Sequence, residues 1–165
     1  MTNYWNIPGI PRKGWTSENV YDVRADGQSV EETDYEICMM CNNERIRYVH
    51  ELSHPAVDEI FKVGCICAEK MTEDYINPQE REKEVRNKSI RRSTFLKKLW
   101  DKSQKGNYTL SYRGHRFTIF KDRLSTKYKC VIDEQFGDHK FDTIDQAKNG
   151  IFEGIEYYKR KGLWK

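Results

Sequence analysis

Two short cysteine-bearing stretches, Tyr35-Glu-Ile-Cys38-Met-Met-Cys41-Asn-Asn43 and Val63-Gly-Cys65-Ile-Cys67-Ala-Glu-Lys-Met71, decide the expected fold of the first half of this chain. They hold four of its five cysteines. Two thiolates a few residues apart can bind one ion from a single turn, and a second pair completes the tetrahedral site that zinc prefers. We therefore predict a structural zinc site formed by Cys38, Cys41, Cys65 and Cys67.

The residues around each pair favour this interpretation. Asn42 and Asn43 tolerate the left-handed conformation that turns a chain around a bound ion. The second pair follows an expected strand end and the flexible Gly64, at the start of a short helix. Cys67 is placed where the helix dipole favours a thiolate. Because a Cys-x-Cys pair is tight, the fourth ligand stays open between Cys65 and His50.

A second metal motif overlaps the first, because His50-Glu51-Leu-Ser-His54 spells H-E-x-x-H. In metalloproteases two histidines one helical turn apart hold zinc, and the glutamate activates a water molecule. Here Pro55 disfavours a helical conformation at His54, and the residues before His50 are strand-like. We expect no catalytic residues in this motif and keep a metal-dependent hydrolase as the weakest alternative.

Composition restricts the class of protein. The chain has 165 residues, of which 37% are apolar and 33% are charged, so its core must be modest. Small modules of this kind gain folding free energy from a bound metal. No stretch approaches the roughly 20 apolar residues of a membrane span. The N-terminal residues show no apolar segment of the kind found in secretory signal peptides. We expect a cytoplasmic protein with free thiols and no membrane partner.

Charge is distributed unevenly along the chain. Residues 1–80 hold 7 Lys and Arg against 15 Asp and Glu, residues 81–105 hold 10 against 3, and residues 106–165 hold 12 against 8. The first part is therefore acidic, and the rest is basic. This asymmetry predicts that a polyanion would bind the second part, whereas the acidic part could contact a protein partner.

Four segments follow from these patterns. We predict an irregular N-terminal arm over residues 1–34, a zinc-binding module over 35–76, a basic helical segment over 77–105 and a sheet-and-helix domain over 106–165. Within the third segment, Pro78 suits the first turn of a helix from about 79 to 102. Its candidate nucleic-acid contacts are Arg86, Lys88, Arg91, Arg92, Lys97 and Lys98.

The last segment shows two alternating strands, 115–121 and 127–133, and we expect a third near Lys140 and Phe141. Alternation assigns Cys130 to the core and Arg116, Lys127 and Lys129 to the opposite face. The run 143–146 is a capping box that should open an amphipathic helix. The expected fold class is α+β, with a small zinc-ribbon or treble-clef module, a linking basic helix and a three-stranded antiparallel sheet packed on one helix.

These segments resemble known modules. The stretch from Cys38 to Met71 resembles a zinc-ribbon module of uncharacterised phage and bacterial proteins, in which a Val-Gly-x-x-Cys run supplies the third ligand, here Cys67. The last domain is similar to AP2 and integrase arm-binding domains, whose closing Phe-x-Thr-x-x-x-Ala matches 141–147. That resemblance implies DNA binding through the exposed sheet face.

The order of elements from residue 79 is also similar to a double-stranded RNA-binding domain. That family opens its last helix with Lys-Lys-x-Ala-Lys, whereas this chain has Asp145-Gln-Ala-Lys148. We therefore rank DNA above duplex RNA. The sequence predicts a non-enzymatic, zinc-stabilised nucleic-acid-binding protein, possibly of phage or mobile-element origin. The alternative is a protein-interaction factor that acts on a host protein.

Overall fold

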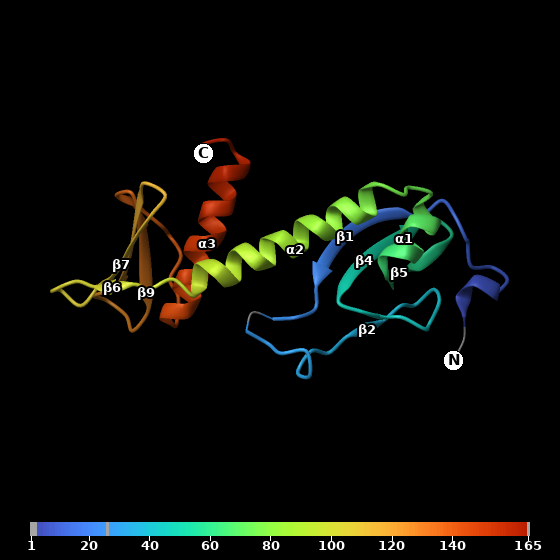
Figure 1. Cartoon of the computed structure of the whole chain (residues 1–165), viewed down its shortest axis with the longest axis horizontal. Coiled ribbons are helices and arrows are strands. Elements are labelled where there is room, and N and C mark those ends of the chain that lie inside the picture. The colour runs from blue at the N-terminus through green and yellow to red at the C-terminus, as the bar shows by residue number, and fades with distance from the viewer. Residues whose placement is uncertain (1–2, 26, 165) are drawn as a thin grey trace. The chain divides into compact units, whose positions relative to one another are not determined.

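The computed structural model describes residues 3–25 and 27–164, and the chain divides into two compact units (Figure 1). Unit 1 comprises residues 1–90 and unit 2 comprises residues 91–165. The boundary falls inside helix α2, Asn77–Leu96. Helices and antiparallel sheets occupy separate stretches of the chain, which confirms the expected α+β class.

Unit 1 is built on a three-stranded antiparallel sheet in the order β1–β4–β5. Its strands are β1, Thr16–Asp22, β4, Tyr48–His54, and β5, Val57–Val63. β4 lies in the middle, where Val49, His50 and Leu52 are fully buried. The turn between β4 and β5 contains Pro55, which has no N–H to donate to a sheet ladder and so suits this position.

The segment that we expected to be an irregular arm differs from that expectation, because it contains β1. Val20 pairs with His50 of β4, and the register shifts between Ser17 and Asn19. A short 3₁₀ helix, Tyr4–Asn6, precedes it, and Trp15 is buried in the core. The register shift interrupts the period of two along this edge strand, so the sequence shows no clear alternation.

Two very short strands and one helix complete unit 1. Strands β2, Glu36–Ile37, and β3, Arg45–Ile46, pair antiparallel and enclose the first cysteine pair. Asn42 has a φ of 58°, as its side chain predicted. Helix α1, Cys65–Thr72, begins directly after β5, with Gly64 as its N-cap. The second cysteine pair therefore lies in the first turn of α1.

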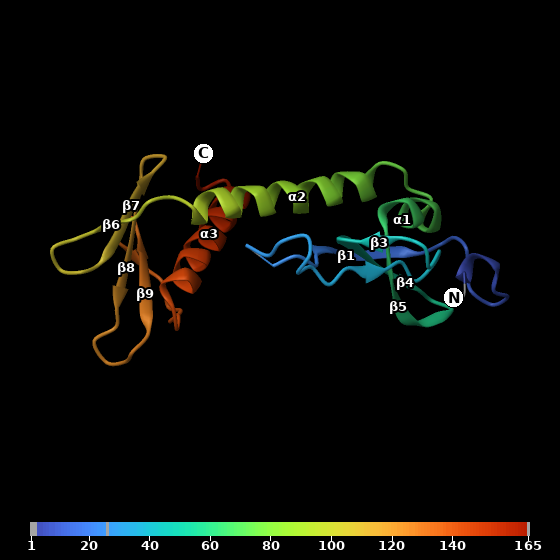
Figure 2. The same cartoon turned by 60° about the horizontal axis from the view of Figure 1, so that its bottom comes forward.

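Unit 2 contains a five-stranded antiparallel sheet in the order β10–β9–β8–β7–β6, rather than the three strands expected (Figure 2). The strands are β6, Asp101–Lys102, β7, Tyr108–Tyr112, β8, His115–Lys121, β9, Tyr128–Ile132, and β10, Gln135–Phe136. Phe141 forms only an isolated bridge with Tyr128. The long third strand is β7, which lies before β8 in the sequence.

Helix α3, Ile144–Arg160, packs on β8 and β9. Thr143 caps it by accepting a hydrogen bond from the Gln146 backbone N–H, as the capping box predicted. Its buried residues are Ala147, Ile151, Phe152 and Ile155. Cys130 belongs to the same core, as predicted, and its thiol lies 3.5 Å from the Ala147 carbonyl oxygen.

Helix α2 is shorter at its C-terminal end than the expected range of 79–102. It ends at Leu96, and Lys102 belongs to β6. Phe95 is buried in unit 2 and Trp100 packs beside it, whereas Leu99 is 92% exposed. No helix among residues 3–25 and 27–164 combines the length and apolar character needed to cross a membrane.

Candidate metal centre and nucleic-acid interface

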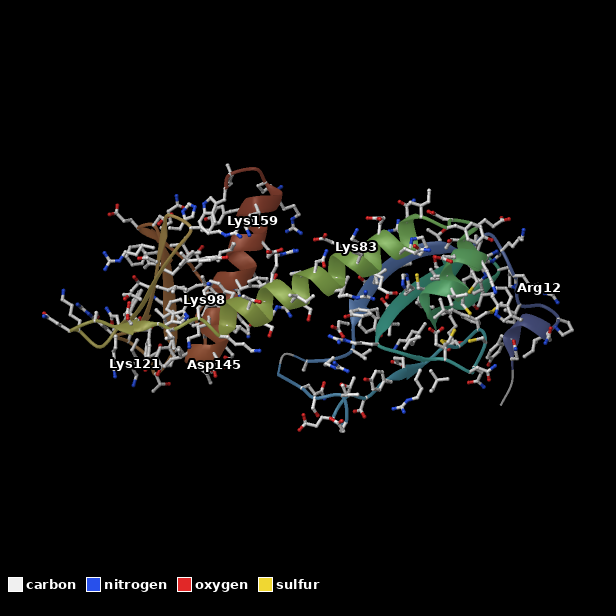
Figure 3. The ribbon with its side chains drawn as sticks, in the orientation of Figure 1. Arg12, Lys83, Lys98, Lys121, Asp145 and Lys159 are labelled. Atoms are coloured by element: carbon white, nitrogen blue, oxygen red, sulfur yellow. The ribbon has the colours of Figure 1, made fainter. Side chains whose placement is uncertain are left out.

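Three of the four predicted zinc ligands come together in unit 1. The sulfur atoms of Cys38, Cys41 and Cys67 lie within 4.8 Å of one another, and this group could hold a metal ion. Sulfur atoms gather around α1 in Figure 3. Cys38 and Cys41 are brought together by a turn in which the Asn42 N–H donates to the Cys38 carbonyl oxygen at 2.8 Å. Cys67 reaches the same point from the first turn of α1.

The electrostatics of this thiol cluster favour negative charge on one sulfur. The Cys67 thiol donates a hydrogen bond to Cys38, which lowers the pKa of Cys38 to about 5, with further help from the Cys41 and Gly64 backbone N–H groups. The same bond is the largest cause that raises the pKa of Cys67. A second thiolate is thus disfavoured unless a cation is present, as expected for a metal-binding thiol cluster.

The N-terminal segment contacts the thiol cluster. The Tyr4 N–H donates a hydrogen bond to the carbonyl oxygen of Met40 at 2.9 Å, and Met40 lies between Cys38 and Cys41 in the sequence. Trp5 packs against the unit 1 core, and its side chain acts to lower the pKa of Cys67. The sequence did not predict this contact, because no pattern in residues 1–15 indicates which part of unit 1 they pack against.

Cys65 lies apart from the thiol cluster, although it was predicted as a ligand with Cys67. Both residues belong to α1, where each residue turns the helix by about 100°, so side chains two apart point in nearly opposite directions. Cys65 groups instead with His50 and Glu82, whose ligand atoms all lie within 4.8 Å of one another. The second candidate for a fourth ligand, His50, is therefore also in this other group.

The His50, Cys65 and Glu82 group is strongly desolvated. Burial is the largest cause that lowers the pKa of His50, which keeps the imidazole neutral. Burial also raises the pKa of Cys65 to about 12, with added repulsion from Glu82 and Glu69. Burial likewise raises the pKa of the nearby Glu44 carboxyl, with repulsion from Cys38 and Glu82.

The H-E-x-x-H motif is not assembled as a protease site. His50 and His54 both belong to β4, and four residues of strand rise roughly 13 Å, too far for two ligands of one ion. His54 packs against Trp15 and accepts a hydrogen bond from the Ala56 N–H. Glu51 accepts one from Asn19 at 3.1 Å. These contacts give Glu51 and His54 structural roles.

The predicted contacts on the basic helix are largely engaged with the protein itself. Arg91 and Arg92 form ion pairs with Glu156 and Glu153 of α3, at 2.7 and 2.9 Å. Arg86 pairs with Glu82 at 2.9 Å. The remaining members differ in their surroundings: Lys98 lies 4.2 Å from the centre of the Tyr112 ring, Lys88 is half-buried and Lys97 is exposed.

The sheet face opposite α3 carries the other predicted contacts. Arg116 is exposed there, and its guanidinium has no ion-pair partner within the described residues. Lys129 pairs with Asp122 at 3.5 Å, and Lys127 pairs with Asp142 at 3.3 Å. Arg116, Thr118 and Val131 help to line a shallow hollow of about 410 Å³, with Asp133 and Glu134.

Two aromatic rings stand on the same face. Cross-strand pairing places Phe120 opposite Lys129 and Phe136 opposite Val131. The ring centroids of Phe120 and Phe136 are 6.1 Å apart, and Phe136 is 73% exposed. Phe136 is not among the predicted contacts, because a strand of two residues shows no alternation in the sequence.

Comparisons with protein-family models, with curated proteins and with solved structures found no match to this chain.

Proposed function

We propose that this chain is a zinc-stabilised nucleic-acid-binding protein, in which unit 1 is organised by zinc and unit 2 binds DNA. The observation that carries the proposal is the open sheet face of unit 2, which places Arg116, Phe120 and Phe136 on one surface. Unit 2 holds 18 Lys and Arg against 9 Asp and Glu, a net charge of +9. Unit 1 holds 11 against 17, a net charge of −6.

Zinc is the ion that best suits the thiol cluster. Soft thiolate ligands select zinc and related ions, and zinc favours tetrahedral sites with sulfur ligands. The order of elements supports the treble-clef expectation: a turn with Cys38 and Cys41 is followed by the β4–β5 hairpin and by a helix that carries Cys67 in its first turn. All five cysteines are free, which suits a reducing cytoplasm.

The sheet face offers two kinds of contact to DNA. Arg116 can bind a phosphate or the edge of a guanine, and phenylalanine rings can contact thymine methyl groups or stack on unpaired bases. A net charge of +9 on unit 2 supplies the long-range attraction to the phosphate backbone. The ion pairs of Arg91 and Arg92 make those two residues part of the unit 2 fold, so the sheet face is the better interface.

Fluorescence anisotropy with labelled DNA tests this proposal. Duplex and single-stranded oligonucleotides of one sequence should bind the full chain at low salt, with affinity falling as salt rises. Arg116→Ala should reduce the salt slope by about one unit, because each phosphate that a side chain neutralises adds about 0.9 to that slope. Phe136→Ala should weaken binding by about 1–3 kcal/mol and leave the slope unchanged, because stacking releases no counterions.

Arg12→Ala is the matched control, since it removes the same charge from an exposed position in unit 1. It should bind DNA like the wild type. Two results would contradict DNA binding by the sheet face. The full chain would not bind DNA at low salt, or the Arg12→Ala and Arg116→Ala variants would lose affinity for DNA equally. Binding of RNA in preference to DNA would redirect the proposal to the other nucleic acid. A protein-interaction role for the acidic unit 1 stays the alternative prediction.

A further inference from the structure

We propose that unit 1 holds a second metal ion, of the zinc class, at the group formed by His50, Cys65 and Glu82. The three residues come from β4, α1 and α2, and they are 15 and 17 positions apart in the sequence. Their ligand atoms nevertheless lie within 4.8 Å of one another. The fold therefore brings together one nitrogen, one sulfur and one oxygen donor at a single point.

The spacing of the donors suits a metal better than a hydrogen bond. The Nε2 atom of His50 lies 3.4 Å from a carboxylate oxygen of Glu82. That exceeds the usual 2.7–3.2 Å of an N–H···O hydrogen bond. Zinc bonds of about 2.0–2.3 Å in a tetrahedron place neighbouring ligand atoms roughly 3.3–3.8 Å apart. The histidine and carboxylate thus already have the separation of two ligands on one ion.

The imidazole of His50 provides the second, independent observation. Its side chain is 0% exposed, and its Nδ1 atom has no hydrogen-bond partner among the described residues. Buried polar atoms are almost always paired, so this ring is poorly satisfied by the protein alone. The nitrogen that faces Glu82 is Nε2, and a buried neutral imidazole is a common metal ligand.

The surroundings of the group attract a cation. The Sγ atom of Cys65 lies 3.9 Å from a Glu69 carboxylate oxygen, and a Glu44 carboxylate oxygen lies against Gly64, next to Cys65. Arg86 pairs with one oxygen of Glu82 at 2.9 Å and leaves the other oxygen facing His50. A mixed nitrogen, sulfur and oxygen set suits zinc, and a water molecule could complete four-coordination.

The second site is separate from the thiol cluster. It uses none of Cys38, Cys41 and Cys67, and Cys65 and Cys67 project from different sides of α1. The proposal therefore does not depend on DNA binding or on zinc at the thiol cluster. It also explains why the chain has a Cys-x-Cys pair, since each cysteine serves a different ion.

Metal content measured by mass spectrometry tests the proposal on the full chain, after equilibration with zinc and removal of unbound ions. The wild type should hold two zinc ions per chain. Glu82→Gln and Cys65→Ser, which change different elements, should each reduce the content to one. Glu80→Gln is the matched control: it makes the same change on an exposed residue of the same helix and should leave two ions.

X-ray absorption at the zinc edge distinguishes the remaining possibilities. With two sites, four cysteines are shared by two ions, so each zinc should show on average about two sulfur neighbours at about 2.3 Å and the rest nitrogen or oxygen at about 2.0–2.1 Å. One zinc per chain, retained in the Glu82→Gln variant, would overturn the proposal. One zinc with four sulfur neighbours would also overturn it, because Cys65 would then complete the thiol cluster.

Discussion

Asp122 shows how a single residue organises the charged loop beyond β8. It is 8% exposed and accepts hydrogen bonds from Lys140 and Ser125, each at 2.8 Å. Lys129 lies 3.5 Å from its other oxygen. The hydrogen bond from Lys140 is the largest cause that holds the pKa of Asp122 well below its usual range. Two lysines of the basic unit are therefore kept in place by one carboxylate.

Asp122→Asn should lower the melting temperature of unit 2 at pH 7. Because folding lowers the pKa of Asp122, its stabilisation is present above the unfolded pKa of about 3.9 and is lost as the pH falls from there toward the folded value. The difference in melting temperature between the variant and the wild type should become smaller below about pH 4. Thermal melts across pH 2–7 measure this, with Asp142→Asn, which removes an exposed pair, as a control that should change little. If the two melting temperatures differ by the same amount at every pH, the Asp122 carboxylate does not stabilise unit 2 through its charge.

At the scale of elements, the close approach of β3 to the start of α1 depends on Gly64. A Cβ atom added there would lie 2.8 Å from Cγ2 of the buried Ile46 and would clash with the Glu44 carboxylate. The backbone N–H of Gly64 also helps to lower the pKa of Cys38. The glycine therefore couples the packing of the helix to the geometry of the thiol cluster.

Gly64→Ala should destabilise unit 1 by about 1–3 kcal/mol, the usual cost of overpacking, and weaken its metal binding. Gly137→Ala is the control, because its added Cβ meets only an ordinary contact of 3.6 Å at the Cys130 carbonyl oxygen. Denaturant unfolding and zinc titration measure the two effects. If the Gly64→Ala variant has the stability and the zinc affinity of the wild type, the close approach of β3 to α1 is not required for either.

At the scale of the whole molecule, each unit has its own hydrophobic core. The unit 1 core includes Trp15, Leu52, Phe61 and Met71, and the unit 2 core includes Phe95, Phe117 and Ile151. Both candidate metal groups found in the described residues belong to unit 1. Metal should therefore stabilise one unit and leave the other unchanged.

Removal of metal by a chelator should lower the melting transition of unit 1 and leave that of unit 2 in place, because structural zinc supplies folding free energy directly. Cys38→Ser and Cys41→Ser should each reproduce this effect. Calorimetry with and without chelator separates the two transitions. Cys130→Ser is the control, because it removes a thiol from the unit 2 core. It should lower only the melting transition of unit 2. An unchanged unit 1 transition in the chelated wild type would contradict a structural metal.

The sequence by itself determined the features that depend on local pattern. The capping box at Thr143, the left-handed turn at Asn42, the core position of Cys130 and the cysteine knuckle follow from side-chain chemistry within a few residues. The α+β class followed from alternation and helical spacing in the same way.

The tertiary structure alone decided which distant residues meet. It placed Cys65 with His50 and Glu82, because a helix turns residues two apart to opposite sides. It paired Arg91 and Arg92 with α3, and it added β1 and β10, whose strands are too irregular or too short to show a period. Contacts across 15 to 65 positions depend on packing that no local pattern encodes, so the second metal group and the place of Phe136 on the sheet face emerged only from the fold.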